Sequence, residues 1–479
     1  MALLVGIGAC TTGDDDSTGP EGATAISVGD DGGSEPPAVG GLAADRPSGS
    51  AFDSSGDVIP ASPPFLDGPL DELTIANLER VYESVQEGVD TAAIRALGST
   101  GDPRLGWVLS DLLRFFQSGD VAETTVSAFN DLMGTTVTFD PFRGAWTPVT
   151  NLMIAWDLPA FPGYAGYKER LFTVVEPGWA PFFADEASNI DWRLLSWGGV
   201  LIDDRPLGDT RPCLGGCIPA LDDPVVTDAA GGSWYPDDGV VFAVTIAGES
   251  RAYPKNIMEV HEMVNDTLGG RRIGVPYCTL CGSAQAYLTD QMPSGIETPV
   301  LRTSGLLSRS NKVMYDLVTK SVFDTFLGTA LSGPLREADV TLEQVSVIAT
   351  TWGEWKAAHP DTTIVAEDGG IGRTYDPDPL GGRDAEGPIF PVGDVDPRLS
   401  VQEYVIGVER PDGAAIAFPT TPVRRALSAG RRVSVEGVRL QLDGGGVRAF
   451  LVDGTELATH QAFWFAWSQF RPDTLLWEE

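Results

Sequence analysis

Basic residues are scarce in this chain. Among its 479 residues, lysine and arginine total 32 against 68 aspartates and glutamates, which gives a formal net charge of -36. A nucleic-acid backbone is bound by clustered lysines and arginines, and acidic residues outnumber these two types by more than two to one here. An anionic lipid surface would repel the same charge. The composition therefore excludes nucleic acid as a partner and indicates a strongly acidic surface that favours solubility.

The N-terminus lacks an apolar run of transmembrane length, because residues 1–9 are too few to cross a bilayer. These small and apolar residues lead directly into Cys10, and the sequence Ile7-Gly8-Ala9-Cys10 resembles a bacterial lipobox. In such a motif the preceding residues are a cleaved signal and the cysteine carries the lipid. We expect a signal over 1–10, lipidation of Cys10, and an extracytoplasmic protein of the cell envelope that is held to the membrane by its lipid anchor.

Large apolar residues are almost missing from residues 11–66, which are rich in Gly, Asp, Ser and Pro. Such a segment buries too little surface to offset the conformational entropy lost on folding. We therefore expect a disordered tether. The remaining residues, roughly 410, suffice for two or three domains with their own cores.

Helical periodicity begins after this tether. Apolar residues recur at helical spacing over 73–85 and again over 105–116, where Gly101-Asp102-Pro103 supplies a cap and a first-turn proline. A third helix is predicted over 121–133. The run resembles the helix-turn-helix unit of HEAT-type solenoids, and a small helical bundle packed on the main domain fits the same pattern.

We assign residues 67–135 to a small all-α segment that could dock a protein partner, and residues 136–190 to a connecting region. Beyond them, short runs of strand-forming residues alternate with Gly, Asp and Pro. This change from helical periodicity to short strand-forming runs predicts a separate β-rich main domain over 191–479.

Two local patterns occur twice in the β-rich part. A strand-turn-strand pattern that ends in an aromatic residue and proline occurs over 240–254 and again over 403–419. A short aromatic helix that ends at a Pro-Asp-Thr turn and leads into a strand occurs over 355–365 and again over 467–477. The predicted fold class is α+β: a β-rich main domain with pseudo-repeated hairpin and helix-turn units, preceded by a small all-α segment.

Only five cysteines are present, and four of them form two local pairs. Cys213 and Cys217 are predicted to form a local disulfide, which an exported protein permits. Cys278 and Cys281 form a CxxC motif, whose spacing allows a thiophilic metal site, a redox-active or structural disulfide, or free thiols with another task. A thioredoxin-type CxxC begins a helix, whereas this one reads as a turn into a strand, so that fold is disfavoured.

Histidine is nearly absent, so His261, seventeen residues before Cys278, is a candidate partner for the two thiols. A helix, a turn and a returning strand could bring them together. Two sulfurs and one imidazole suit zinc with an open position, or monovalent copper. A purely structural role for this histidine is the alternative.

Tyr315, Asp316 and Arg373 are weaker catalytic candidates. They stand among strand residues without an obvious core purpose, and each could equally serve a turn or a strand ladder. No glycine-rich phosphate loop, serine-hydrolase elbow or HExxH pattern is present. The motifs therefore specify no reaction.

Seven stretches of the sequence resemble a bacterial family catalogued as domain of unknown function 3179. In family order they are IPALDDP (218–224), HEMVND (261–266), YCTLCGS (277–283), SGLL (304–307), VMYD (313–316), GPL (333–335) and FWFAW (463–467). The resemblance covers about residues 191–477 and implies no activity, since the family has none established. Thr279 departs from the usual proline between the two cysteines. Cys213 and Cys217 fall in an insertion, which favours a local disulfide over a shared metal site.

The leading hypothesis is a membrane-tethered extracytoplasmic protein with a soft-metal site (Zn or Cu) or a thiol-redox site formed by Cys278, Cys281 and His261. The alternative is a ligand-binding or scaffolding lipoprotein whose cysteines form purely structural disulfides. Whether the protein is an enzyme stays open at this stage.

Overall fold

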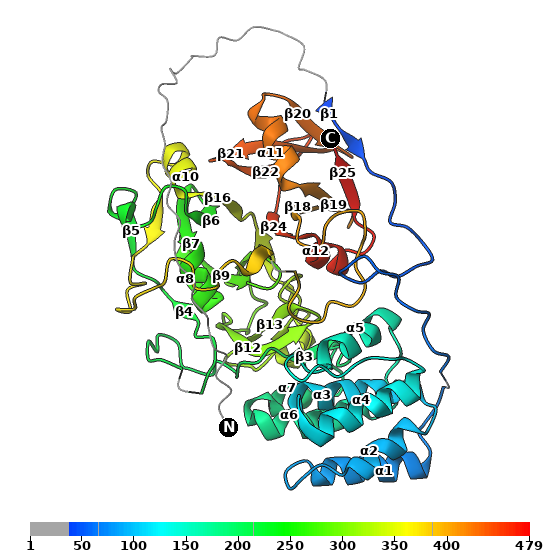
Figure 1. Ribbon diagram of the computed structural model, residues 1–479. Coiled ribbons are helices and arrows are strands. Elements are labelled where there is room, and N and C mark those ends of the chain that lie inside the picture. The colour runs from blue at the N-terminus through cyan, green and yellow to red at the C-terminus, as the bar shows by residue number, and fades with distance from the viewer. Residues whose placement is uncertain (1–37, 66, 214, 386) are drawn as a thin grey trace, which may run out of the picture. The chain divides into compact units, whose positions relative to one another are not determined.

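The computed structural model describes residues 38–65, 67–213, 215–385 and 387–479 (Figure 1). The predicted signal, Cys10 and the first part of the tether lie outside these residues. Within the described residues, no helix is both long and apolar enough to cross a membrane.

The first folded part is helical, as predicted, and Asp71, Asp90 and Asp102 cap its first three helical elements with side-chain hydrogen bonds. Its elements are α1 (Glu72–Ser84), α2 (Thr91–Gly98), η1 (Pro103–Leu105), α3 (Gly106–Phe115), α4 (Gly119–Met133), α5 (Trp146–Trp156), α6 (Tyr164–Val175), η2 (Pro177–Trp179) and α7 (Ala180–Phe183).

Residues 136–190, predicted as a connecting region, are mostly helical and contain α5, α6 and α7. Pro148 lies in the first turn of α5, where a helix does not need the missing N–H, so it does not interrupt the helix.

The helical part shares one hydrophobic core with a four-stranded sheet of the main domain. This sheet, ordered β14-β13-β12-β3, contributes Leu306, Val313 and Tyr315 to that core. Its strands are β3 (Leu195–Trp197), β12 (Leu301–Ser308), β13 (Asn311–Asp316) and β14 (Val322–Phe323). The shared core favours a bundle packed on the main domain over a free-standing solenoid.

The rest of the main domain is built twice. One sheet has the order β16-β6-β7-β17-β5, and another has the order β24-β18-β19-β25-β2. In both, the third and fourth strands are parallel and the other neighbours antiparallel. The bounds are β16 (Ile348–Thr351), β6 (Val240–Ile246), β7 (Glu249–Pro254), β17 (Thr363–Val365), β5 (Val226–Asp228), β24 (Thr459–Phe463), β18 (Tyr404–Glu409), β19 (Ala415–Pro419), β25 (Leu475–Glu478) and β2 (Gly41–Leu42).

A second pair of sheets repeats in the same way. The order β15-β11-β9-β8-β4 corresponds to β23-β22-β21-β20-β1, and in each the last strand pairs parallel to its neighbour. The bounds are β15 (Glu343–Val345), β11 (Ala286–Leu288), β9 (Arg271–Cys278), β8 (Met263–Leu268), β4 (Leu221–Asp222), β23 (Glu456–Leu457), β22 (Gly446–Leu451), β21 (Val438–Asp443), β20 (Arg432–Val435) and β1 (Ala38–Val39). We call the two sets the first repeat (221–365) and the second repeat (38–42 with 404–478).

Matching helices complete the two repeats. They are α8 (Lys255–His261) and α11 (Thr420–Ser428) after the hairpins, and α10 (Trp352–Ala358) and α12 (Trp464–Phe470) before the last strands; η3 (Gly231–Trp234), α9 (Gly333–Glu337) and η4 (Arg383–Ala385) complete the chain. The indole of Trp355 donates to Thr362 Oγ1 at 2.9 Å, and that of Trp467 donates to Thr474 Oγ1 at the same distance. The predicted pseudo-repeat and the α+β class are confirmed.

The predicted tether is wrong for residues 38–65. Strand β1 pairs with β20, β2 pairs with β25, and Trp156 Nε1 donates to the carbonyl of Pro60 at 2.8 Å. The chain therefore begins the second repeat before the helical part and completes it at the C-terminus (Figure 1). Composition did not reveal these strands, because edge pairing uses backbone groups and needs few large side chains.

The repeats differ at one turn that matters for chemistry. In the second repeat, β21 and β22 are joined by Gly444 and Gly445 alone. In the first repeat, the equivalent connection between β9 and β11 is longer. It contains the CxxC motif and the short strand β10 (Ser283–Ala284), which pairs with the end of β9.

Candidate functional site

The CxxC motif lies at the end of a strand. Cys278 is the last residue of β9, residues 279–282 form a turn, and the amide of Cys281 donates to the carbonyl of Cys278 at 3.2 Å. Gly282 adopts a positive φ of 58°, which closes the turn. The predicted strand-to-turn placement is confirmed, and a thiol at this position lacks the helix dipole of a thioredoxin-type site.

The second repeat covers this turn. The amide of Phe463 in β24 donates to the carbonyl of Cys281 at 2.8 Å, and a side chain at Gly282 would collide with Tyr404 and Phe463. Both cysteine side chains are buried, at 1% and 0% exposure. The dithiol therefore sits where the two repeats meet.

The two thiols share one hydrogen-bond acceptor. Both sulfur atoms lie 3.6 Å from the carbonyl oxygen of Ser310, and the amide of Lys312 donates to Cys278 Sγ at 3.4 Å. No disulfide joins them; they are free thiols.

The surroundings make the two thiols unequal. Burial alone would raise the pKa of Cys278, but the hydrogen bonds from the Cys281 thiol and the Lys312 amide outweigh it and lower that pKa. Burial, together with the neighbouring Cys278 sulfur, raises the pKa of Cys281 well above its usual value. Cys278 is therefore the thiol that ionises first.

A buried acid and base lie beside Cys278. The carboxylate of Glu262 accepts a hydrogen bond from Thr279 Oγ1 at 2.8 Å and lies 3.8 Å from Lys312 Nζ. The Lys312 ammonium also donates to the backbone carbonyl of Glu262. Burial raises the pKa of Glu262 and lowers the pKa of Lys312, so it disfavours the charged form of both side chains and favours sharing one proton between them.

A small cavity of 170 Å³ opens onto this group. Its polar lining side chains are those of Cys278, Thr279, Glu262, Lys312, Arg383 and Thr303, and Cys281 is not part of the lining. Arg383 Nη1 donates to Thr279 Oγ1 at 3.3 Å from the loop after β17. Only the thiol that ionises first therefore faces the cavity.

Sequence reasoning missed Glu262, Lys312 and Arg383. Glu262 directly follows His261, and a left-handed backbone (φ 51°) at the end of α8 turns the two side chains toward different cavities. Lys312 is one of only five lysines in the chain, and this rarity was the one feature of the sequence that could have pointed to it.

His261 does not join the thiols. Its Nδ1 lies 2.7 Å from the carbonyl of Pro219 and must donate, so its Nε2 accepts from the Tyr375 hydroxyl at 2.7 Å. Burial lowers the pKa of His261 to about 4, which keeps the ring neutral. Among the described residues, no three His, Cys, Asp or Glu side chains are grouped to hold a metal ion. The predicted ligand set of His261, Cys278 and Cys281 is therefore not assembled.

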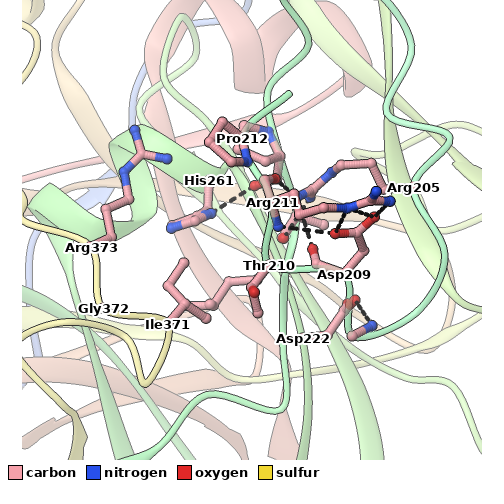
Figure 2. Close-up of a pocket in the computed structure, with 14 residues that line it drawn as sticks. Arg205, Asp209, Thr210, Arg211, Pro212, Asp222, His261, Ile371, Gly372 and Arg373 are labelled. Atoms are coloured by element: carbon pink, nitrogen blue, oxygen red, sulfur yellow. Dashed lines mark hydrogen bonds and ion pairs between the residues drawn. The ribbon is translucent and has the colours of Figure 1, made fainter. Parts of the chain in front are cut away.

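His261 lines a second cavity of 420 Å³ instead, together with Arg205, Arg211 and Arg373. Figure 2 shows Arg373 and His261 on one side of this cavity and Arg205 on the other. Arg205 is paired with Asp203, and Arg211 with Asp209. Arg373, a weak candidate from the sequence, has no ion pair within the described ranges and stacks 5.6 Å from the Tyr375 ring.

The other predicted residues have structural contacts. Tyr315 donates to the carbonyl of Asp203 at 2.7 Å, and Asp316 accepts from the amides of Val300 and Thr319 at a turn. These contacts place neither side chain at the dithiol. Cys213 and Cys217 are joined in a local disulfide.

Neither the curated proteins nor the solved structures contain a significant match to this chain. A family match exists for residues 215–450, which span both thiols, Glu262, Lys312 and Arg383. These residues match the family described as "Protein of unknown function (DUF3179)", as the motifs predicted.

Proposed function

We propose that Cys278 and Cys281 form a thiol-redox centre that cycles between a dithiol and a disulfide. The observation that carries this proposal is the shared contact of both sulfurs with the Ser310 carbonyl, at 3.6 Å each, on a turn closed by the Cys281 amide. Two thiols on such a turn need little movement to bond. Oxidation removes two electrons and two protons from the pair.

The inequality of the two thiols gives each a role. Cys278 faces the 170 Å³ cavity and is the attacking thiol, because the thiolate is the nucleophile. Cys281 stays behind it as the resolving thiol, which closes the disulfide and releases the product. Glu262 and Lys312 hold the proton that Cys278 loses.

The donor set fits redox chemistry better than it fits zinc. A zinc site needs at least three protein ligands, and both ring nitrogens of His261 are engaged elsewhere. Glu262 uses one carboxylate oxygen on Thr279 and faces Lys312 with the other. Two sulfurs alone would leave a soft metal without a third ligand from these residues.

The test uses a variant in which Cys10, Cys213 and Cys217 are replaced by serine, so that only the CxxC thiols remain. The reduced protein should bind two alkylating groups, and after mild oxidation it should bind none and weigh two hydrogens less. Equilibration in dithiothreitol buffers of graded potential should give one reversible two-electron transition. Native mass spectrometry of the same samples reports any bound metal.

Two results would oppose the proposal. If Cys278 and Cys281 stay reduced in oxidising buffer, they have no redox cycle. If they stay oxidised in strong reductant, they form a purely structural disulfide. The second result would favour a ligand-binding or scaffolding protein, for which the 420 Å³ cavity beside His261 would be the first surface to test. Cys278→Ser and Cys281→Ser each serve as controls, since neither can form the internal disulfide.

We also propose that the protein is exported and lipid-anchored through Cys10, with the helical part free to meet a protein partner. The lipobox-like Ile7-Gly8-Ala9-Cys10 supports this, and so does the Cys213–Cys217 disulfide, since structural disulfides persist outside the cytosol. Metabolic labelling with a radioactive fatty acid should mark the protein but not its Cys10→Ala variant. An unlabelled protein in the soluble fraction would contradict this.

A further inference from the structure

The cavity beside Cys278 restricts what can oxidise it. At 170 Å³ it lies below the ~300 Å³ of the smaller typical ligand sites. Cys278 is 1% exposed, and the turn behind it is covered by the second repeat. A protein disulfide cannot bring its sulfur atoms to a thiol at this depth, so the oxidant must be a small molecule.

The lining combines polar and apolar side chains. Cys278, Thr279 and Arg383 are among the polar ones, and Ile218, Leu306 and Phe390 are among the apolar ones. Ile389, also in the lining, is 44% exposed and gives the cavity an apolar surface open to solvent. Such a site matches a molecule with one small polar head and a short hydrocarbon tail.

From this geometry, and resting on the redox centre proposed above, we infer that the oxidant is a small alkyl hydroperoxide and that the protein is a thiol-dependent hydroperoxide reductase. The cavity admits the O–O group to Cys278, and the cationic side chains of Arg383 and Lys312 face the oxygen that gains charge. A larger disulfide such as glutathione disulfide exceeds the space.

The first chemical step oxidises Cys278. Its thiolate attacks the terminal peroxide oxygen, an S–O bond forms and the O–O bond breaks, which gives a sulfenic acid and an alkoxide. The alkoxide takes the proton held by the Glu262–Lys312 pair and leaves as an alcohol. Thr279, hydrogen-bonded to Glu262 and Arg383, keeps these groups in place as a positioning residue.

The second step closes the disulfide. The Cys281 sulfur attacks Cys278 Sγ, the S–O bond breaks, and the departing hydroxide leaves as water with the proton of the Cys281 thiol. The sulfurs have then lost two electrons and the peroxide has gained two. Two equivalents of a small external thiol restore the dithiol by thiol–disulfide exchange.

The experiment uses the variant that keeps only the two CxxC cysteines. In its reduced form, this variant is mixed with tert-butyl hydroperoxide, with hydrogen peroxide or with glutathione disulfide. Quenched samples are weighed intact, and the alcohol is counted. With tert-butyl hydroperoxide we expect one alcohol per disulfide formed, at a rate about 100-fold or more above that of free cysteine at the same pH, the factor that positioned proton donors supply. Glutathione disulfide should react no faster than it does with free cysteine.

Two variants test the roles of the residues. Cys281→Ser should stop at the sulfenic acid, which dimedone traps on Cys278. Arg383→Gln should slow the peroxide reaction at least about 10-fold, as expected for loss of a charge-stabilising donor, while the pH dependence of Cys278 alkylation stays in place. Arg383 is only partly buried, so its replacement leaves the core intact.

The outcomes separate this inference from the redox proposal on which it rests. If glutathione disulfide oxidises the pair quickly and both peroxides react at the rate of free cysteine, the peroxide inference is overturned and the redox centre stands. If no oxidant or redox buffer produces the disulfide, both fail. A wild-type rate in Arg383→Gln would remove the proposed role of that residue and, with it, the argument from the cationic lining of the cavity.

Discussion

At the scale of single residues, the site depends on which of two neighbours faces the thiols. His261 is the obvious candidate partner of the thiols in the sequence, but both nitrogens of its ring are hydrogen-bonded elsewhere, to Pro219 and Tyr375. The next residue, Glu262, takes a left-handed backbone and reaches Thr279 beside Cys278. The positive φ of Glu262 therefore places a buried carboxylate beside the thiols, where the sequence predicted the imidazole of His261.

Glu262→Gln should lower the pH at which Cys278 ionises. The negative charge of Glu262 destabilises the Cys278 thiolate, so removing that charge favours the thiolate. The substitution also leaves the Lys312 ammonium without its carboxylate partner, and this positive charge favours the thiolate as well. We expect the midpoint of the iodoacetamide alkylation profile to fall by about one pH unit, as for removal of a nearby like charge. Glutamine keeps an oxygen for Thr279, which protects the local structure.

The matched control is Glu259→Gln, on the helix α8 that directly precedes Glu262. Glu259 pairs with Lys255 and lines a different cavity, so its replacement should leave the alkylation midpoint unchanged. A midpoint that moves upward in Glu262→Gln, or equally in both variants, would show that Glu262 does not act on Cys278 through its charge.

At the scale of elements, the repeated aromatic helices explain much of the framework. Trp355 and Trp467 are each buried, and each donates its indole N–H to a threonine seven residues later. That threonine ends the turn and directly precedes the parallel strand, β17 or β25. The same hydrogen bond therefore fixes the same helix-to-strand corner in both repeats.

Thr362→Val and Thr474→Val should destabilise the protein by similar amounts. Each leaves a buried indole N–H without an acceptor, which costs about 1–3 kcal/mol in the free energy of unfolding. Urea denaturation measures this cost, and Thr362→Ser and Thr474→Ser, which keep the hydroxyl, should recover most of it. A cost in one repeat only would mean that the two corners are not energetically equivalent.

At the scale of the whole molecule, the chain closes on itself. Residues 38–42 supply the edge strands of the second repeat, and Ala43 donates to the carbonyl of Leu476 at 2.7 Å. The first repeat and the helical part are thus inserted between the start and the end of the second repeat. Since the second repeat covers the CxxC turn, the N-terminal strands support the site indirectly.

Gly40→Ala should weaken this closure. Gly40 has a φ of 78° between β1 and β2, and a side chain there would collide with Glu478 and Trp477. We expect a loss of about 1–3 kcal/mol, the usual cost of a strained backbone position, read from thermal or urea unfolding. Gly41→Ala is the control, because no atom lies within 4 Å of the added carbon. Equal stability of the two variants would mean that the N-terminal strands are not part of the folded unit.

The sequence by itself determined the family, the α+β class, the pseudo-repeat and the strand-to-turn position of the CxxC, because each depends on local spacing of apolar, aromatic and turn residues. Only the tertiary structure decided that Glu262 and Lys312, not His261, adjoin Cys278, and that Ala38–Leu42 belongs to the last sheets. These are contacts between segments that are distant in the sequence. The first depends on the positive φ of Glu262, and the second on the backbone hydrogen bonds of the edge strands β1 and β2. Neither leaves a periodic pattern in the sequence.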